Sequence, residues 1–506
     1  MTLDRIVDGA EILFRRGDAE VAGIGYDSRR VHPGDAFVAI KGESTNGNRY
    51  IDAAIQAGAA AVITDSPQEP PRAGVAWIVV PHGRRALARM SANFYSRPAE
   101  KLTICGITGT NGKTTFVFLL ESILTAAGRS SALISTIEYH VPPQHCMEAP
   151  HTTPEALELQ RIFAEAVRAG ATEAVMEVSS IALAQDRVFA IPFQVAVFSN
   201  LTRDHLDYHK SFEEYFAAKQ KLFAGCGTEP PAYAVVNLDD EYGRQLAKFS
   251  RSRSTLFTYG LEKGDFHAEK ISLGQDGTRF DLVMPDARLP IWSPLLGRVN
   301  VYNILAAAAA AYARQCSTHE IVEGVKALAR VPGRFEKIDQ GQPFTVVADY
   351  AHTDDALRNL TALAREFVAR SHGRVLTVFG CGGDRDRSKR PLMGEAAGRG
   401  SDFVVLTSDN PRSEDPLAIM NDALPGLQRT GTPYALEPDR RAAVALAIDR
   451  ARPGDIVLIA GKGHEKKQIL REQVLPFDDV EVARELLAAA GFEGPAGTAR
   501  GAEARP

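Results

Sequence analysis

The sequence contains few cysteines, and their spacing excludes two kinds of protein. Five of its 506 residues are cysteines, and no two of them form a C-x-x-C pair. A disulfide framework is built from an even set of cysteines, and a cysteine zinc site from close pairs. We therefore expect a protein of the reducing cytoplasm with neither a disulfide framework nor a zinc site. The cysteines are Cys105, Cys146, Cys226, Cys316 and Cys381.

Long apolar runs and an excess of one charge are also missing. The net charge is -5 and 24% of the residues are charged, so neither nucleic acid nor a membrane surface is indicated as a partner. The most apolar stretch, 304–313, is rich in alanine and far too short to cross a bilayer. We expect it to form a tightly packed helix. Residues 1–16 include acidic side chains and no signal-peptide core, in agreement with a cytoplasmic location.

The length suits several globular domains. A chain of 506 residues, 45% of them hydrophobic, has room for about three domains with a core each. Predicted strands, helices and turns divide it into α/β units at 1–101, 102–331 and 332–490. Residues 491–506 are rich in Gly, Ala, Pro and charge, and we expect a disordered tail there.

The first unit has a glycine-rich loop but no phosphate motif. We predict a strand at 36–40, a polar loop at 41–50, a helix at 51–58 and a strand at 60–64. These elements leave a structural role and a substrate-gripping role equally open.

The chain is organised around residues 103–115, Thr-Ile-Cys-Gly-Ile-Thr-Gly-Thr-Asn-Gly-Lys-Thr-Thr. An apolar run precedes the glycines and an apolar segment, 116–124, follows them, which predicts a strand, a loop and a helix. The N–H groups of such a loop, with the helix dipole, bind polyphosphate. Lys113 would reach the terminal phosphates and Thr114 would ligate Mg²⁺. The pattern is G-x-x-G-x-x-G-K-T, with Ile107 where the strict phosphate loop has its first glycine. An ordinary glycine-rich turn is the disfavoured alternative.

Polar residues end two later predicted strands of the second unit. Glu177 follows an apolar strand, and another strand leads into a segment with His205 and His209. Ligands bind at the carboxyl ends of strands in parallel α/β sheets, so we expect Glu177 and His205 near the phosphate loop. Either could serve Mg²⁺, although a hard cation prefers the oxygens of Glu177. His209 is better explained as a structural, hydrogen-bonded histidine.

Lys219 lies on the apolar face of a predicted helix that begins with a capping box, Ser211 and Glu214. The residues three and four positions away are apolar or aromatic: Tyr215, Phe216, Leu222 and Phe223. A buried unpaired ammonium is costly, so either the side chain extends to solvent or the ammonium has been removed chemically. Helix geometry alone favours extension to solvent.

Four predicted strands of the third unit end in polar clusters, at 349–352, 380–385, 408–412 and 461–465. Clusters at the ends of all the strands of one parallel sheet indicate a small-molecule site. Arg385 and Arg412 together with Glu465 suit a ligand that carries both carboxylate and ammonium groups. The alternative is that Arg412 only caps the next helix through Glu414 or Asp415.

These motifs together resemble those of the Mur ligases, ATP-dependent enzymes that form amide bonds in peptidoglycan precursor synthesis. The resemblance extends over about residues 20–485, and its motifs are 109–115, Glu-Val-Ser-Ser at 177–180, 200–209, 349–352, 380–385 and Asp-Asn-Pro-Arg at 409–412. It is strongest to the ligases that add meso-2,6-diaminopimelate to UDP-N-acetylmuramoyl-L-alanyl-D-glutamate. It implies an N-terminal domain for the UDP substrate, a central ATPase domain with a mainly parallel sheet and a Rossmann-like C-terminal domain for the amino acid. ATP and Mg²⁺ are the implied cofactors, and a monomer is expected.

The resemblance also implies the site residues by their positions in this sequence. ATP would be bound by Gly109, Thr110, Asn111, Gly112, Lys113, Thr114 and Thr115. The catalytic set would be Lys113, Glu177, His205 and Lys219, and Mg²⁺ would be held by Thr114, Glu177, His205 and Lys219. The family carbamylates the lysine of an Ala-Ala-Lys segment, here Lys219, which replaces the solvent-directed interpretation. The UDP substrate would be bound by Ser28, Glu43, Ser44, Thr45, Thr152, Thr153, Ser179, Gln185 and Arg187. Diaminopimelate would be bound by Arg385, Asp409, Asn410, Pro411, Arg412, Gly461 and Glu465.

Three residues depart from the family pattern. Ile181 replaces a usual histidine, His151 a usual asparagine and Asp354 a common proline. None is itself an implied contact, but His151 leaves dipeptide binding less certain.

The implied reaction activates the D-glutamate side-chain carboxylate as an acyl phosphate, which the diaminopimelate amine then attacks. One rival is a folylpolyglutamate synthase, which shares a similar loop but has no evident need for the first unit or for Asp-Asn-Pro-Arg. The other is an ATP-gated regulatory protein that has lost the chemistry.

Overall fold

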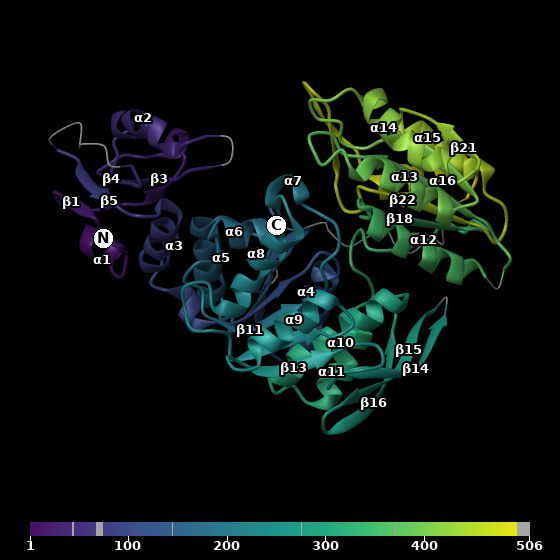
Figure 1. The fold of residues 1–506 in the computed structure, drawn as a ribbon, viewed down its shortest axis with the longest axis horizontal. Helices are drawn as coiled ribbons and strands as arrows, with labels where there is room; N and C mark the ends of the chain where they lie inside the picture. The colour runs from purple at the N-terminus through teal and green to yellow at the C-terminus, as the bar shows by residue number, and fades with distance from the viewer. Residues whose placement is uncertain (43–44, 67–73, 144, 275, 370, 493–506) are drawn as a thin grey trace, which may run out of the picture.

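A computed structural model describes residues 1–42, 45–66, 74–143, 145–274, 276–369 and 371–492. The described chain is a mixed α/β protein whose larger sheets are mainly parallel, as predicted. Figure 1 shows a central lobe with the N-terminal lobe on one side and the C-terminal lobe on the other.

The N-terminal lobe is built on a five-stranded sheet of order β1-β5-β4-β3-β2, in which only β1 runs antiparallel to its neighbour. The strands β3 and β4 are buried along their whole length, as in parallel sheets covered on both faces. The predicted strands and helix of this unit correspond to β3, β4 and α2. Its elements are α1 (Leu3–Val7), β1 (Phe14–Arg16), β2 (Ile24–Gly25), η1 (Ser28–Arg30), β3 (Ala36–Ala39), η2 (Gly47–Tyr50), α2 (Ile51–Gln56), β4 (Ala61–Thr64), β5 (Ala76–Val79), α3 (Gly83–Phe94) and η3 (Pro98–Lys101).

The central lobe is built on an eight-stranded sheet of order β13-β12-β11-β6-β10-β7-β8-β9. The first six strands of this order are parallel, and β8 and β9 add an antiparallel hairpin at one edge. The elements along the sheet are β6 (Thr103–Thr108), α4 (Lys113–Ala126), β7 (Ser131–Ile134), β8 (Glu138–Val141), β9 (His145–Glu148), α5 (Ala156–Arg168), β10 (Glu173–Glu177), α6 (Ser180–Ala184), β11 (Phe193–Phe198), α7 (Leu206–His209), α8 (Phe212–Ala224), β12 (Tyr233–Asn237), α9 (Glu241–Ser250) and β13 (Thr255–Tyr259).

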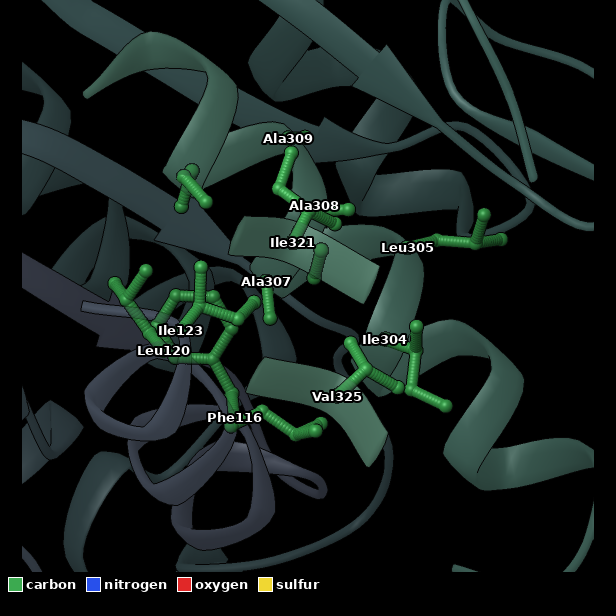
Figure 2. Packing of buried hydrophobic residues seen from close by; sticks show 14 of the residues in the cluster. Phe116, Leu120, Ile123, Ile304, Leu305, Ala307, Ala308, Ala309, Ile321 and Val325 are labelled. Carbon is green, nitrogen blue, oxygen red and sulfur yellow. The ribbon is translucent and has the colours of Figure 1, made fainter. Parts of the chain in front are cut away.

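Two further helices, α10 (Arg298–Ala313) and α11 (Thr318–Ala327), complete the core of this lobe. The alanine-rich segment predicted to be a packed helix lies in α10, and its alanines belong to the same buried cluster as α4 and α11 (Figure 2). A Cβ atom at Gly324 of α11 would lie 2.4 Å from the Cα atom of Ile123 in α4. The two helices therefore pack with their backbones in contact, which only a glycine at position 324 allows.

A three-stranded antiparallel sheet in the central lobe was not predicted from the sequence. It consists of β14 (His267–Gly274), β15 (Gly277–Met284) and β16 (Ala287–Ser293) in sequential order. Burial alternates along much of β15 and β16, as expected when one face of a sheet is packed and the other is solvated.

The C-terminal lobe contains a six-stranded sheet of order β17-β18-β22-β19-β20-β21, parallel except for β17. One face packs against α12, α13 and α14 and the other against α15 and α16. The elements are β17 (Glu336–Ile338), β18 (Thr345–Asp349), α12 (Asp354–Val368), β19 (Val375–Cys381), α13 (Lys389–Gly400), β20 (Phe403–Ser408), α14 (Pro416–Gln428), β21 (Tyr434–Leu436), α15 (Arg440–Arg450), β22 (Ile456–Ala460), β23 (Lys467–Ile469), β24 (Val474–Pro476) and α16 (Asp479–Ala489). Of the predicted tail, residues 493–506 lie outside the described residues.

Polar contacts join the lobes. Arg84 of the N-terminal lobe lies 3.1 Å from Glu155 of the central lobe. Lys467 of the C-terminal lobe lies 3.1 Å from Glu148 of the central lobe. Across the described residues, no helix is long and apolar enough to span a membrane.

Candidate functional site

The glycine-rich loop joins β6 to α4, as predicted, with Lys113 as the first residue of the helix. A Cβ atom at Gly109, where φ is 151°, would lie 1.9 Å from Ser199 Oγ. A Cβ atom at Gly112, where φ is 88°, would lie 2.4 Å from Asn303 Oδ1. Both positions need glycine because neighbouring segments pack against the loop backbone. The helix N-terminus is therefore positioned to offer its free N–H groups to an anion.

Two lysine side chains converge on one carbonyl of this loop. Lys113 Nζ donates to Gly109 O at 3.0 Å and to Thr110 O at 2.9 Å, and Lys219 Nζ donates to Gly109 O at 2.7 Å. The interpretation that Lys219 extends to solvent is wrong, because the residue is only 1% exposed. Helix α8 lies across the loop, so its apolar face carries Lys219 inward.

The shared environment shifts the pKa of both amines. Desolvation lowers the pKa of Lys113, against the opposing effect of Glu177 and Asp204. Desolvation and the nearby Lys113 charge lower the pKa of Lys219 well below its usual 10.5. The site therefore holds an amine that loses its proton far more readily than an exposed lysine does.

Glu177 and His205 lie near these lysines. Glu177 ends β10, where its carboxylate accepts from Thr136 N at 2.8 Å and from Thr136 Oγ1 at 3.0 Å. His205 has a left-handed φ of 52°. Its pKa is lowered by desolvation and by Lys219 and Lys113, although Asp204 opposes the shift. The expectation that Glu177 and His205 approach the phosphate loop agrees with these charge effects.

His209 behaves as the structural histidine that the sequence favoured. It is buried, and its Nε2 atom lies 2.9 Å from Ser180 Oγ. Its ring packs against Tyr215 with the centroids 5.1 Å apart.

The polar clusters at the ends of β18, β19, β20 and β22 converge on one cavity of about 230 Å³ between the central and C-terminal lobes. A parallel sheet places these ends along one edge, which is why segments far apart in the sequence meet there. Arg203, Asp204, His205 and Asp207 of the central lobe also line it. The residues from the C-terminal lobe are Tyr350, His352, Gly382, Arg385, Asp386, Lys389, Asp409, Asn410, Arg412, Gly461 and Glu465.

Arg412 is held at the cavity but does not form the predicted alternative cap. Its backbone has a φ of 53°, and its Nη1 atom donates to Gly383 O at 2.7 Å. Glu414 instead pairs with the buried Arg390 at 2.7 Å, and Asp415 accepts from the N–H of Ala418.

Arg385 is the second guanidinium of the cavity. Neither Arg385 nor Arg412 has a carboxylate within 4.0 Å among the residues that the structure describes. Desolvation and the charge of Arg385 lower the pKa of Arg412. The charges of Asp409, Glu465 and Asp384 oppose that shift. With no carboxylate of the described residues within hydrogen-bond distance of either guanidinium, both arginines can still bind an anionic group of a ligand.

Lys462 forms an ion pair with Glu465 beside the cavity. Sequence reasoning did not predict this role. The lysine is 0% exposed. Its Nζ atom lies 3.1 Å from Asn410 Oδ1, 3.4 Å from Glu465 Oε2 and 2.5 Å from Lys467 O. Asn410 in turn donates to Glu465 Oε2 at 2.7 Å. Burial and Asp409 raise the pKa of Glu465, whereas Lys462 opposes the shift.

A second cavity, of about 390 Å³, opens beside the phosphate loop. Asn300, Asn303 and Arg334 line it, and none of them was predicted. Arg334 donates to Thr114 Oγ1 at 3.0 Å, and Asp355 accepts from Asn111 Nδ2 at 2.8 Å. In the sequence, Arg334 follows a Pro-Gly turn signal in the segment Pro-Gly-Arg-Phe-Glu at 332–336, and this was the one local pattern that could have drawn attention to it.

Residues expected to bind the UDP substrate fall on two lobes. Ser28 begins η1, and Thr45 Oγ1 lies 3.3 Å from Tyr50 Oη. Glu43 and Ser44 lie outside the described residues. The other five expected residues lie on the central lobe. Thr153 Oγ1 lies 3.4 Å from Ser179 Oγ, and Arg187 donates to Thr153 O at 3.0 Å and to Gln185 Oε1 at 2.7 Å. Thr152 Oγ1 accepts from Thr136 Oγ1 at 3.1 Å.

The structure places the three residues that depart from the family pattern as follows. Ile181 lies in α6, and Asp354 begins α12 and accepts from Arg358 at 2.5 Å. The side chain of His151 is exposed, while its carbonyl accepts from Tyr139 Oη.

A glycine-rich loop suited to phosphate lies in one lobe, and a cavity lined by charged side chains lies at the strand ends of another. These features define a multidomain nucleotide-binding protein, and comparison with known proteins identifies the family. The Mur ligase family catalytic domain matches residues 20–95, the Mur ligase middle domain 107–311 and the Mur ligase glutamate ligase domain 333–463. The chain belongs to the Mur ligase family.

Individual relatives agree with this assignment. A protein of Solibacter usitatus named UDP-N-acetylmuramoyl-L-alanyl-D-glutamate–2,6-diaminopimelate ligase is 53% identical over 474 residues, 94% of each chain. A solved structure of a ligase with the same name is 35% identical, with a TM-score of 0.65 over 93% of this chain and 95% of that one. The folylpolyglutamate synthase of Mycobacterium tuberculosis, solved with ADP and AMPPCP, is 18% identical with a TM-score of 0.61. The match covers 75% of this chain and 93% of the synthase, and it shows a similarity of fold.

Proposed function

We propose that this Mur ligase adds meso-2,6-diaminopimelate to UDP-N-acetylmuramoyl-L-alanyl-D-glutamate, with hydrolysis of ATP to ADP and phosphate, in cytoplasmic peptidoglycan precursor synthesis. The observation that carries the proposal is the cavity where Arg385, Arg412 and Glu465 meet opposite the phosphate-loop lobe. The names of the most similar relatives support it.

ATP is proposed to bind at residues 109–115 and to extend into the cavity lined by Asn300, Asn303 and Arg334. The N–H groups of the loop and Lys113 would bind the phosphates. Lys113 now donates to loop carbonyls, contacts that a phosphate oxygen would replace. A positive charge held there stabilises the charge that develops during phosphoryl transfer.

Magnesium fits this site on one condition. Thr114 Oγ1 and the Glu177 carboxylate are oxygen ligands of the kind that Mg²⁺ prefers, and His205 lies nearby. A protonated Lys219 would repel the ion, so we propose that Lys219 is carbamylated. Its low pKa supports this, because only a neutral amine reacts with carbon dioxide. The carbamate would replace a buried cation by an anion, and Mg²⁺ would neutralise phosphate charge.

We propose the remaining steps from the chemistry of the reactants and from the residues that line the cavity. The D-glutamate side-chain carboxylate would take the γ-phosphoryl group of ATP to form an acyl phosphate, with ADP as the leaving group. The neutral diaminopimelate amine would then attack the carbonyl carbon, phosphate would leave, and the amine would lose a proton to solvent as the amide forms. Arg412 and Arg385 would bind the distal carboxylate of diaminopimelate and Glu465 its distal ammonium. Holding the reactants in line between lobes supplies much of the acceleration.

We assign the domains at 1–101, 102–331 and 332–490 to the UDP substrate, ATP and the amino acid respectively. Ser28 and Thr45 would contact the uridine nucleotide, and Thr152, Thr153, Ser179, Gln185 and Arg187 the muramyl dipeptide. The enzyme is proposed to act as a monomer.

A panel of amino acids, assayed with the UDP-muramyl dipeptide and ATP, tests the proposal through ADP release. We expect ADP to appear in proportion to amide and only when both the dipeptide and diaminopimelate are present. Turnover with a folate and glutamate would support the folylpolyglutamate synthase alternative. ADP release that ignores both substrates would support the ATP-gated regulator.

A further inference from the structure

A cluster of metal-ligand side chains lies on the β8–β9 hairpin, outside the two cavities described above. Among the residues that the structure describes, Glu138, His140 and Cys146 form the one group of three or more His, Cys, Asp or Glu side chains whose ligand atoms all lie within 4.8 Å of one another. Glu138 and His140 are two positions apart on β8, and Cys146 is the cross-strand partner of His140 on β9. The pleat of the hairpin therefore places all three side chains on the same face.

The distances suit replacement of protons by a metal ion. His140 Nε2 lies 2.9 Å from Glu138 Oε1, and Cys146 Sγ lies 3.0 Å from Glu138 Oε2. Ligand atoms around tetrahedral zinc, at about 2.0–2.3 Å from the metal, lie about 3.3–3.6 Å apart. The two contacts are somewhat shorter than these values and use different oxygens of Glu138, and one ligand atom from each residue lies within 4.8 Å of the other two. Binding of one ion therefore requires rotation of these side chains but no rearrangement of the strands.

The outer contacts of His140 match those of a metal-bound histidine. Its Nδ1 atom lies 2.8 Å from Glu121 Oε1, so a carboxylate on α4 orients the ring and leaves Nε2 directed at Glu138 and Cys146. A second carboxylate behind the ligating histidine is the usual partner in zinc sites. Phe118 packs edge-on against the same ring, with the centroids 5.7 Å apart.

We propose that Glu138, His140 and Cys146 bind one Zn²⁺ ion, with Glu121 as the positioning residue and water in the fourth position. Binding replaces the thiol proton of Cys146 and the Nε2 proton of His140, and both protons leave to solvent. The set of one sulfur, one nitrogen and one oxygen suits zinc rather than magnesium or calcium. The ion would tie both strands of the hairpin together just beyond Thr136, which donates to Glu177.

Titration of the untagged, reduced, metal-free protein with Zn²⁺ tests this proposal, with Co²⁺ as a spectroscopic probe. We expect one zinc ion per chain and a thiolate-to-cobalt absorption band. Cys146→Ser should abolish the band, and the exposed position of Cys146 makes this variant safe for folding. Glu121→Gln should weaken zinc binding by about tenfold to a hundredfold.

Two matched variants separate this site from adventitious binding. His145 is the exposed residue next to Cys146 and projects from the opposite face of β9. Cys226 is a half-buried thiol outside the cluster. His145→Ala and Cys226→Ser should both retain stoichiometric binding and the cobalt band. The proposal is overturned if the wild-type protein binds no zinc, or if Cys146→Ser binds zinc as tightly as the wild type does.

Discussion

We predict that the enzyme prefers diaminopimelate over L-lysine and that Arg412→Ala removes this preference. The two amino acids differ at the far end, where diaminopimelate carries a carboxylate beside the amine. Arg412 lies at the cavity with one guanidinium nitrogen on Gly383 O, and its remaining N–H groups are available for a carboxylate. L-Lysine would leave them without that partner.

The size of the effect follows from the cost of an unpaired charge. A buried charge that loses its partner costs about 3–5 kcal/mol, and each 1.4 kcal/mol is about a factor of ten. Arg412 is only partly buried, so the lower end applies. We expect wild-type kcat/KM to favour diaminopimelate by at least about a hundredfold. Arg412→Ala should lower kcat/KM for diaminopimelate by a similar factor and change that for lysine by only a few-fold.

The assay measures amide formation with both amino acids for the wild type, Arg412→Ala and two further variants. Arg412→Lys retains the charge without the planar fork and should retain only part of the preference. Arg399→Ala removes an exposed arginine of α13 that pairs with Glu395, and it should leave both substrates unaffected. Thermal unfolding of each variant checks that the fold is intact.

The assignment of Arg412 is wrong if the wild type uses lysine as well as diaminopimelate, or if Arg412→Ala keeps its preference. Loss of the preference in Arg385→Ala alone would transfer the carboxylate contact to Arg385.

Three further predictions concern the phosphate loop and the stability of the C-terminal lobe. Lys113→Ala should abolish ADP formation in a folded protein, and near-normal turnover would contradict a phosphate-binding role. Lys219→Ala should be nearly inactive and partly rescued by short carboxylates; a bare ammonium in crystals grown with bicarbonate near neutral pH would count against carbamylation. The Glu414 pKa is lowered to about 2, chiefly by Arg390, so this carboxylate should stabilise the fold fully above its ordinary pKa of 4.5 and lose that effect as the pH falls towards 2. The difference in unfolding temperature between wild type and Glu414→Gln, equivalent to about 1.5–3 kcal/mol at pH 7, should therefore shrink at pH 3.5, and a constant difference would refute the ion-pair explanation.

The sequence alone determined the family and most of the local structure. The apolar run before Gly109 and the segment after Lys113 predicted β6 and α4 because strand and helix formation follow local patterns of apolar residues and turns. Polar clusters after four apolar strands predicted a site in the C-terminal lobe, since parallel strands place their carboxyl ends at one edge. The roles of the individual site residues stay predictions that the proposed assays address.

Helix geometry could not predict where the Lys219 side chain lies. A lysine on an apolar helix face can either extend to solvent at the edge of that face or be buried by another segment. Tertiary packing decided the matter by placing the ammonium against Gly109 O. The same limit applies to Lys462, whose burial depends on the segment that folds over it, and to the unpredicted sheet of β14, β15 and β16.

Contacts between distant parts of the chain were decided by tertiary structure alone. Arg334 reaches Thr114 across 220 positions of sequence, and Glu121 meets His140 because α4 packs beside the β8–β9 hairpin. The spacing of the cysteines predicted no zinc site, yet the cross-strand register places Cys146 beside Glu138 and His140. Local sequence patterns specify which residues share a face, but only the packing of faces against one another specifies which side chains meet.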